Sequence, residues 1–485
     1  MSAGFFYVQS RKTEPYNRVM KAMMRWVKCA AVLITVLFLS ACMGHAKPEY
    51  EKKLFDTSCV HTVDVKIAEA DWQDLITHPE EKTKYEADLV IDGEEVKQVS
   101  FSAKGNSSLA LVKSRGDSIR YSLKINFGKN IKGQTFHGLD KLHLQNIFGD
   151  KTYMKEYLAY DLFRKMGVPA PLASFVFITI NGNDFGLYMA VEDLDDSFLD
   201  RTCRGNGSLY QPELSEQALD DEKAEAILAG GNVIVSGARG ADLKYIDDNP
   251  DSYPDIFDNA VTKRSEESDQ RVIAALRKLQ EGKDLKSILV TKELARYFAV
   301  NNYLMNYDTY IGLMTHNYYL YENSGKLSVF PWDYNLAFGA FSMDAVLTHA
   351  NDTREVINMG IDSPLLSIPP EERPLWSRYI ADETCRKEYH AAMDQFLKEQ
   401  IESGAFEKEV DRVYTMIRPY IENDPTKLCT LQDTDEAHEI LKQICLLRAE
   451  SIRRQLNRSL ASETKLQNPA DRVDPAGADV QDLRY

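Results

Sequence analysis

Residues 302–338 place two aspartates, Asp308 and Asp333, in a stretch that is otherwise rich in aromatic and aliphatic side chains. Before Asp308 the apolar residues recur with helical spacing, whereas residues 319–321 and 327–330 alternate as two short strands around a Gly-containing turn. An ionised carboxylate in apolar surroundings is costly unless a cation meets it. The stretch therefore predicts a helix, an aspartate loop, a hairpin and a second aspartate loop, with a metal-binding or proton-transfer role for both carboxylates.

The N-terminus has the pattern of an export signal over residues 1–41. Basic residues between positions 21 and 28 precede an uncharged, mostly aliphatic run at residues 29–41, which is short for a membrane span. The run ends in the letters LSAC, which resemble a bacterial lipobox and predict cleavage before Cys42 and lipidation of that cysteine. We therefore expect an exported lipoprotein, anchored to a membrane on its extracytoplasmic side, with residues 42–54 as a tether. A generic signal peptide with a chance cysteine is the alternative.

Charge and cysteine content narrow the class of protein further. The 485 residues carry a net charge of −16, and removing the basic first 41 residues, with six Lys or Arg and one Glu, takes it to −21. So acidic a chain, with no basic stripe, predicts no nucleic-acid partner. Five cysteines follow Cys42 without metal-type spacing, so at least one is unpaired. Cys429 and Cys445 are candidates for a disulfide, and buried free thiols are the alternative.

The chain divides by its periodicity into an α+β arrangement of two lobes. Residues 55–210 are rich in alternating strands and contain one long amphipathic helix at residues 152–166. Residues 211–268 form an acidic connector, and residues 269–460 are mostly helical. The polar stretch at residues 461–485 is predicted to be a disordered tail.

The order of these parts is that of a protein kinase. A strand carrying Lys124 precedes the long helix, two further strands, an acidic hinge and the two aspartate loops. Phosphoryl transfer needs a lysine to neutralise phosphate, an acid to orient the acceptor hydroxyl, and an Asp and an Asn to hold metal ions. Asp308 supplies the acid, Asn317 the Asn and Asp333 the Asp, and this is the order in which a protein kinase has them. The HRD, DFG, GxGxxG and APE signatures of kinases are absent.

Seven motifs stand out at residues 104–108, 120–127, 138–146, 156–171, 180–193, 306–322 and 331–339, and they read KGNSS, RYSLKINF, GLDKLHLQN, EYLAYDLFRKMGVPAP, INGNDFGLYMAVED, NYDTYIGLMTHNYYLYE and PWDYNLAFG. With them the chain resembles the CotH (spore coat protein H) kinase family, from about residue 55 to residue 458. The resemblance implies an atypical protein-kinase-like fold and transfer of the ATP γ-phosphate to Ser or Thr of a surface or coat protein. It also implies ATP and Mg²⁺ or Mn²⁺ as cofactors, with a protein substrate and, through the lipid, a membrane as partners.

The resemblance also implies a role for each motif residue. Asp308 looks like the catalytic acid/base, and Asp333 and Asn317 look like the metal ligands. Lys124 is our choice for the lysine that binds phosphate, with Glu156 on the following helix as its partner.

Several alternatives remain open at this point. Lys104 and Lys113 compete with Lys124 for the phosphate, and Glu192 competes with Glu156 for the lysine. The KGNSS loop is either a cradle for phosphate or a tight structural turn, and His316 reads as a packed or hydrogen-bonded loop histidine. An exported domain meets little ATP, so the alternative function is a non-catalytic, kinase-like surface lipoprotein for adhesion or coat assembly.

Overall fold

The computed structural model describes residues 47–484, apart from 215–237, 313, 342–351 and 366–367. The chain divides into two compact units, Met1–Pro48 and Glu49–Tyr485, and the second is described below by itself. The predicted signal peptide and Cys42 lie outside the described residues, as does the middle of the predicted connector. No helix of the described residues is long and apolar enough to cross a membrane.

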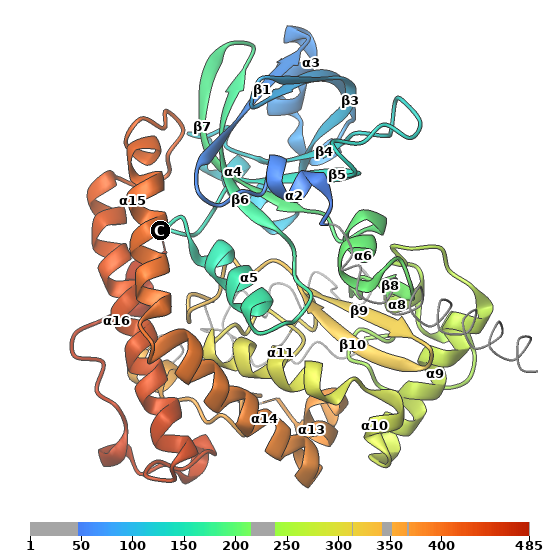
Figure 1. The fold of residues 1–485 in the computed structure, drawn as a ribbon, viewed down its shortest axis with the longest axis vertical. Helices are drawn as coiled ribbons and strands as arrows, with labels where there is room; N and C mark the ends of the chain where they lie inside the picture. The colour runs from blue at the N-terminus through green and yellow to red at the C-terminus, as the bar shows by residue number, and fades with distance from the viewer. Residues whose placement is uncertain (1–46, 215–237, 313, 342–351, 366–367, 485) are drawn as a thin grey trace, which may run out of the picture. The chain divides into compact units, whose positions relative to one another are not determined.

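Seven strands close into a barrel in the order β1-β2-β3-β4-β5-β7-β6, with antiparallel neighbours except for the parallel closing pair β1 and β6 (Figure 1). Alternation along each strand builds its interior: Leu123 and Ile125 are buried in the barrel core, as the pattern at residues 120–127 predicts. The strands are β1 Val60–Ile67, β2 Tyr85–Ile91, β3 Glu94–Lys104, β4 Ser122–Asn126, β5 Lys141–Gln145, β6 Ala173–Ile180 and β7 Asn183–Glu192.

Helices interrupt the barrel sequence at three places. They are α3 Glu69–Thr77, α4 Ser107–Arg115 between β3 and β4, and α5 Lys155–Lys165 between β5 and β6. The predicted helix at residues 152–166 is α5, which contacts both β6 of the barrel and α11 Thr291–Tyr303 (Figure 1). The short helix α4 and strand β5 are among the elements of this region that the periodicity did not identify.

The remainder of the chain is mostly helical, and a small sheet of order β10-β9-β8 lies within it. The predicted hairpin is β9 Tyr318–Asn323 with β10 Lys326–Pro331, and β8 Ser208–Tyr210 adds to its edge. Helices make up most of the described residues after the connector, and α14 continues as a π-helical turn at Leu397–Ile401. They are α9 Glu266–Glu281, α10 Leu285–Ile288, α11 Thr291–Tyr303, α12 Thr353–Ile357, α13 Pro374–Ala381, α14 Glu383–Phe396, α15 Ala405–Glu422 and α16 Leu431–Leu456.

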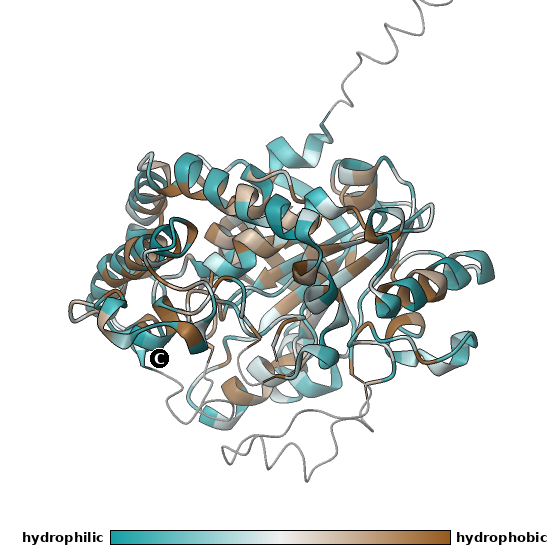
Figure 2. Cartoon of the chain, turned by 90° about the horizontal axis from the view of Figure 1, so that it is seen from below, coloured by the Kyte–Doolittle hydropathy of each residue, from teal (hydrophilic) through white to brown (hydrophobic). Residues whose placement is uncertain are grey.

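The buried hydrophobic residues gather in two clusters. One fills the barrel, and the other runs from α5 through the small sheet to α16. Hydropathy colouring shows teal over the outward helical turns and brown toward the inner strands (Figure 2). The mixed α+β class is therefore confirmed, with a closed barrel in the strand-rich region.

Two predicted flexible segments are instead part of the fold. The end of the expected tether forms α2 Glu49–Lys53, which buries Tyr50, and Leu54 follows in the barrel core. The expected disordered tail at residues 461–485 is ordered as far as residue 484, with short 3-10 turns at Thr464–Leu466, Pro469–Asp471 and Val480–Leu483. The prediction of disorder followed the polar composition of this stretch and overlooked a few apolar residues. Two of them, Val480 and Leu483, are fully buried against the helices.

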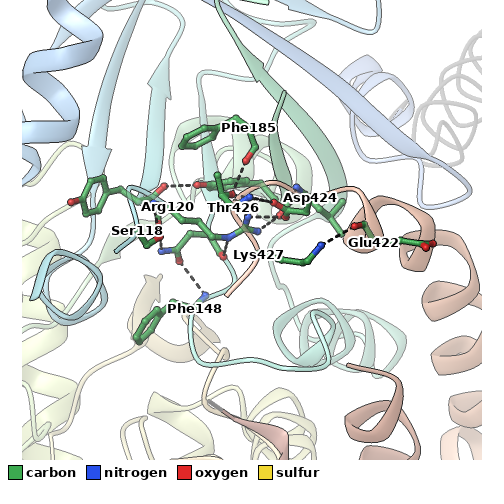
Figure 3. Close-up of polar contacts among 12 residues, drawn as sticks. Ser118, Arg120, Phe148, Phe185, Glu422, Asp424, Thr426 and Lys427 are labelled. Atoms are coloured by element: carbon green, nitrogen blue, oxygen red, sulfur yellow. Dashed lines mark hydrogen bonds and ion pairs between the residues drawn. The ribbon is translucent and has the colours of Figure 1, made fainter. Parts of the chain in front are cut away.

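A buried ion pair joins the barrel to the loop after α15. Arg120, next to β4, is 0 % exposed, and its Nη1 lies 2.8 Å from Oδ2 of Asp424 (Figure 3). The same guanidinium donates to Thr426 Oγ1 at 2.7 Å and to the carbonyl oxygen of Asn146 at 2.9 Å. Gly186 lies directly against this pair, since a Cβ there would come within 2.2 Å of Asp424 Oδ1. A strand position expected to face outward therefore carries a structural junction.

The described cysteines contain no disulfide. Cys59, Cys203, Cys385, Cys429 and Cys445 are all free, and Cys385 and Cys445 are buried. The candidate bridge between Cys429 and Cys445 is therefore not formed, and the buried free thiol is the correct interpretation for Cys445. Burial raises the pKa of the Cys385 thiol to about 12, so that thiol is protonated and unreactive.

Candidate active site

Three neighbouring strands present polar side chains on one outer face of the barrel. In the register of the sheet, Lys124 of β4 lies opposite His143 of β5, and Lys104 at the end of β3 lies opposite Ser122. Since alternate residues of a strand point the same way, His143 and Gln145 share one face of β5. Lys104 Nζ donates to Gln145 Oε1 at 3.1 Å and lies 5.5 Å from the centre of the Trp332 ring.

Helix α5 and the second aspartate loop meet through a tyrosine. Glu156 is in the first turn of α5, and Tyr160, one turn later, donates its hydroxyl to Glu156 Oε1 at 2.7 Å. The backbone N–H of Asp333 donates to the same hydroxyl at 3.0 Å. Asp333 lies in the loop directly after β10 and has a φ of +53°, a backbone conformation that residues other than glycine rarely adopt. The helix that carries Glu156 is thus connected to the aspartate loop.

Lys104, Glu156 and Asp333 form one charge cluster. Burial lowers the pKa of Lys104, and the carboxylates of Asp333 and Glu156 oppose that effect. Burial, and then the negative charge of Asp333, raise the pKa of Glu156 to about 8. Burial also raises the pKa of Asp333, against the effect of Lys104. A pKa of about 8 keeps Glu156 largely protonated at neutral pH, and a cation bound beside it would favour the ionised carboxylate.

Asp308 lies in the loop after α11 with both carboxylate oxygens engaged. His316 Nε2 is 2.5 Å from Oδ1, and Asn317 Nδ2 donates to Oδ2 at 2.9 Å. Burial works to lower the pKa of His316, but the Asp308 carboxylate outweighs it and the pKa is raised. The interpretation of His316 as a hydrogen-bonded loop histidine agrees with this contact. Asp308 also raises the pKa of Asp333, so the two aspartate loops lie within electrostatic reach of each other.

The structure does not bring together the predicted pair Lys124 and Glu156. Lys124 Nζ lies 2.8 Å from Asp193 Oδ2, at the end of β7, and the lysine that acts on Glu156 is Lys104. The alternative carboxylate, Glu192, accepts from Tyr50 and Arg201 instead. Of the lysines considered from the sequence, Lys104 is the one whose charge acts on both Glu156 and Asp333.

Lys113 and the rest of the KGNSS loop, residues 105–108, make no contact with this cluster in the described part of the chain. Lys113 Nζ pairs with Glu80 at 2.5 Å on the surface. Gly105 has a φ of +102°, and Asn106 Oδ1 accepts from Lys82 at 2.6 Å before α4 begins. The loop is a tight turn into a helix, and its role as a phosphate cradle stays a prediction.

Sequence reasoning missed His143 beside this cluster. Its ring packs edge-on to Trp332 with centroids 5.3 Å apart, and its Nε2 lies 3.3 Å from Asp193 Oδ1. Burial, and then Lys104, lower the pKa of His143 to about 3, so the imidazole is neutral. Among the described residues neither ring nitrogen makes a well-formed hydrogen bond. The alternation of KLHLQ at residues 141–145 was the signal that could have placed this side chain.

The oxygen atoms near the cluster fit a hard divalent cation. Asn317 donates its amide nitrogen to Asp308, which leaves its carbonyl oxygen for a ligand, and no hydrogen bond to the Asp333 carboxylate is found among the described residues. The described residues contain no group of three His, Cys, Asp or Glu side chains of the kind that holds a metal alone. Mg²⁺ usually takes one or two carboxylates together with substrate phosphates, so one carboxylate and one amide fit it.

Comparisons with known proteins agree with one another. The family description "CotH kinase protein" matches residues 101–452. The chain is 22 % identical over 312 residues to the inner spore coat protein H of Bacillus subtilis (strain 168), covering 64 % of this chain and 76 % of that protein. It is 34 % identical over 83 residues to the inner spore coat protein H-like protein of the same strain, covering 17 % of this chain and 25 % of that one. The family match includes every residue of the charge cluster.

Proposed function

Because the chain belongs to the CotH kinase protein family, we propose that it is an atypical protein kinase that transfers the γ-phosphate of ATP to Ser or Thr hydroxyls of a protein. The observation that carries the proposal is the convergence of Lys104, Glu156 and Asp333 beside the Asp308 loop. These side chains come from a strand, a helix and two loops that are far apart in sequence, and a purely structural site has no need to bury so many charges there.

Each residue has a part that its surroundings support. Asp308 takes the proton of the acceptor hydroxyl, whose oxygen then bonds to the γ-phosphorus while the bond from that phosphorus to the β–γ bridging oxygen breaks and ADP leaves. His316 and Asn317 hold the Asp308 carboxylate in place through its two oxygens. Lys104 neutralises phosphate charge, and Glu156 with Gln145 orients its ammonium. Lys104 takes this role in place of Lys124.

Asp333 and the Asn317 carbonyl oxygen would hold Mg²⁺ or Mn²⁺ on the phosphates of ATP. A divalent ion there supplies charge neutralisation of the phosphates. The raised pKa of Asp333 and Glu156 supports this role, because two crowded carboxylates favour a bound cation.

The finer fold assignment belongs to the same proposal. Three features support a two-lobe kinase-like layout (Figure 1). Strand β7 of the barrel leads into an acidic segment, α5 lies beneath the barrel, and the two aspartate loops lie in the helical region. The segment Glu192–Asp196 then corresponds to the hinge between the lobes.

We place the protein in the extracytoplasmic envelope or a spore coat. The relative with the longer match is an inner spore coat protein, and the lipobox ending at Cys42 supports a lipid anchor. The substrate would then be a surface or coat protein.

Phosphate transfer by the purified chain tests the proposal. The chain is mixed with labelled ATP and Mg²⁺ or Mn²⁺, beside Asp308→Ala, Asp333→Ala and, as a matched control at an exposed aspartate, Asp482→Ala. We expect label on protein with the unchanged chain and the control, and none with the two site variants. Equal labelling in all four chains, or no labelling and no thermal shift with nucleotide and metal, would contradict it.

A specific observation favours one second candidate, a non-catalytic kinase-like binding module. The Asp308 carboxylate already has a partner on each oxygen, one of them at 2.5 Å, which would also suit a purely structural brace. The same experiment separates the two, since a binding module gives no label, and a module that has kept its metal site still shows a thermal shift with Mn²⁺ that Asp333→Ala abolishes.

A further inference from the structure

Residues 473–484 form an ordered segment that we call the C-terminal clip. It is anchored at Val473, whose N–H donates to Asn358 Oδ1 at 2.9 Å and whose carbonyl accepts from Asn358 Nδ2 at 2.8 Å. Its 3-10 turn, Val480–Leu483, packs on α16. The N–H of Val480 donates to Thr353 Oγ1 at 3.1 Å. Val480 and Leu483 are both 0 % exposed.

One end of the clip is fastened to the start of α5. The carbonyl oxygen of Leu483 accepts from the backbone N–H of Lys151 at 3.2 Å and from Lys155 Nζ at 3.5 Å. Lys155 is completely buried, and its ammonium also donates to the carbonyl of Gly149 at 3.0 Å. Lys155 directly precedes Glu156, so the clip holds the helical turn that presents Glu156 to Lys104.

The clip also contacts the segment that follows Asp333. Arg484 Nη1 donates to the carbonyl oxygen of Ala340 at 3.2 Å. Gly339, with a φ of +73°, lies so near the clip that an added Cβ would come within 3.2 Å of Val480 Cγ1. A single short segment therefore contacts both α5 and the chain just beyond the second aspartate loop.

Inside the site, one side chain joins these two elements. Tyr160 of α5 donates its hydroxyl to Glu156 Oε1 at 2.7 Å, and the backbone N–H of Asp333 donates to the same hydroxyl at 3.0 Å. This link ties α5 to the Asp333 loop at one point, and the contacts of the clip hold the two elements at further points outside the site.

We propose that the C-terminal clip is a positioning strap that holds α5 and the Asp333 segment in register, so that releasing it switches the site off. Its consequence for phosphate transfer rests on the proposed function, but its effect on α5 does not. The strap acts through the backbone carbonyl of Leu483, the Arg484 side chain and the packing of Val480.

Hydrogen exchange tests the strap without any catalytic readout. The full chain is compared with a truncation after Arg472, with the paired substitution Val480→Ala/Leu483→Ala, and with Asp482→Ala, whose side chain is exposed on the same turn. We expect amides of residues 150–158 to exchange at least tenfold faster in the first two variants and unchanged in Asp482→Ala. A synthetic peptide of residues 473–485, added in excess to the truncated chain, should restore the protection.

Phosphate transfer should follow the exchange, with a fall of at least tenfold that the peptide reverses. Unchanged protection of residues 150–158 in both the truncated and the doubly substituted chain would overturn the strap. So would faster exchange in Asp482→Ala, or a peptide that binds without restoring protection. If truncation prevents folding, the doubly substituted chain decides the question. An unchanged chain that transfers no phosphate contradicts the proposed kinase alone, because the exchange result still stands.

Discussion

The junction around Arg120 is fully buried and the cluster around Lys104 is partly buried; both place a cation near carboxylates on the barrel, but they differ in how their polar atoms are satisfied. Arg120 donates to Asp424, Thr426 and two backbone carbonyls, and Asp424 in turn accepts from the N–H groups of Leu187 and Thr426 (Figure 3). Lys104 donates to Gln145 and is shared between two carboxylates of raised pKa.

The contrast separates a structural from a functional use of buried charge. A buried ion pair whose lone pairs and protons are all used fixes one arrangement of the chain. A cluster whose carboxyl groups have raised pKa values holds those groups in unfavourable surroundings, and a bound cation can relieve that cost. The Arg120 junction therefore stabilises the fold, whereas the Lys104 cluster lowers the stability of the fold and favours the binding of a ligand.

The largest expected effect is on stability at the junction. Arg120→Met should lower the free energy of unfolding by about 3–5 kcal/mol, because it leaves the Asp424 carboxylate buried without its cation. Urea unfolding measures the loss. The matched control is Lys387→Met, in a pair with Glu383 that is more than two-thirds exposed, where no measurable change is expected. If Arg120→Met lowered the free energy of unfolding only slightly, the junction would not be a structural ion pair and would resemble the Lys104 cluster instead.

Next in size is the effect of Asp333→Asn on phosphate transfer. We expect a fall of about 100-fold or more, since removing one group that neutralises developing charge commonly costs that much. The free energy of unfolding should stay the same or rise, because the substitution removes one of two repelling carboxylates. Initial rates with labelled ATP and urea unfolding of the same preparations check both parts. Loss of stability together with activity would make Asp333 a structural residue.

A smaller effect is expected in the pH dependence of stability. The pKa of Glu156 is raised to about 8, so between about pH 5 and pH 8 the folded chain keeps a proton that the unfolded chain has released. Its contribution is therefore present at low pH and lost as the pH rises toward 8. Without metal or nucleotide, the unchanged chain should fall below Glu156→Gln in unfolding free energy across this range, and match it near pH 5. Parallel profiles for the two chains would contradict the raised pKa.

The sequence predicted most of the fold because strand alternation and helical spacing are local signals. The strands expected around residues 120–127, 319–321 and 327–330 are found as β4, β9 and β10, and the helix expected at residues 152–166 is found as α5. The errors occurred where long-range packing decides. The polar stretch after residue 461 is ordered by a few buried apolar side chains, and Arg120 is buried because Asp424, 304 residues away, meets it.

The site shows the same division. Asp308, Asn317 and Asp333 could be chosen from their motifs, and the structure brings Asn317 to Asp308. The choice between Lys104 and Lys124 could not be made from the sequence, because it depends on which end of which strand reaches α5. In the structure Lys124 Nζ meets Asp193, while Lys104 is the lysine whose charge acts on Glu156.

The smallest expected effect is at His143, which lies beside the cluster but is not tied into it. His143→Phe should change the free energy of unfolding by no more than about 1 kcal/mol, because neither ring nitrogen has a well-formed hydrogen bond to lose among the described residues and the ring already packs on Trp332. The affinity for Mg²⁺·ADP, measured by calorimetry, should fall several-fold if the neutral imidazole serves the ligand. A stability loss as large as that of Arg120→Met would show that His143 belongs to the satisfied, structural class, and would remove the contrast between the two regions.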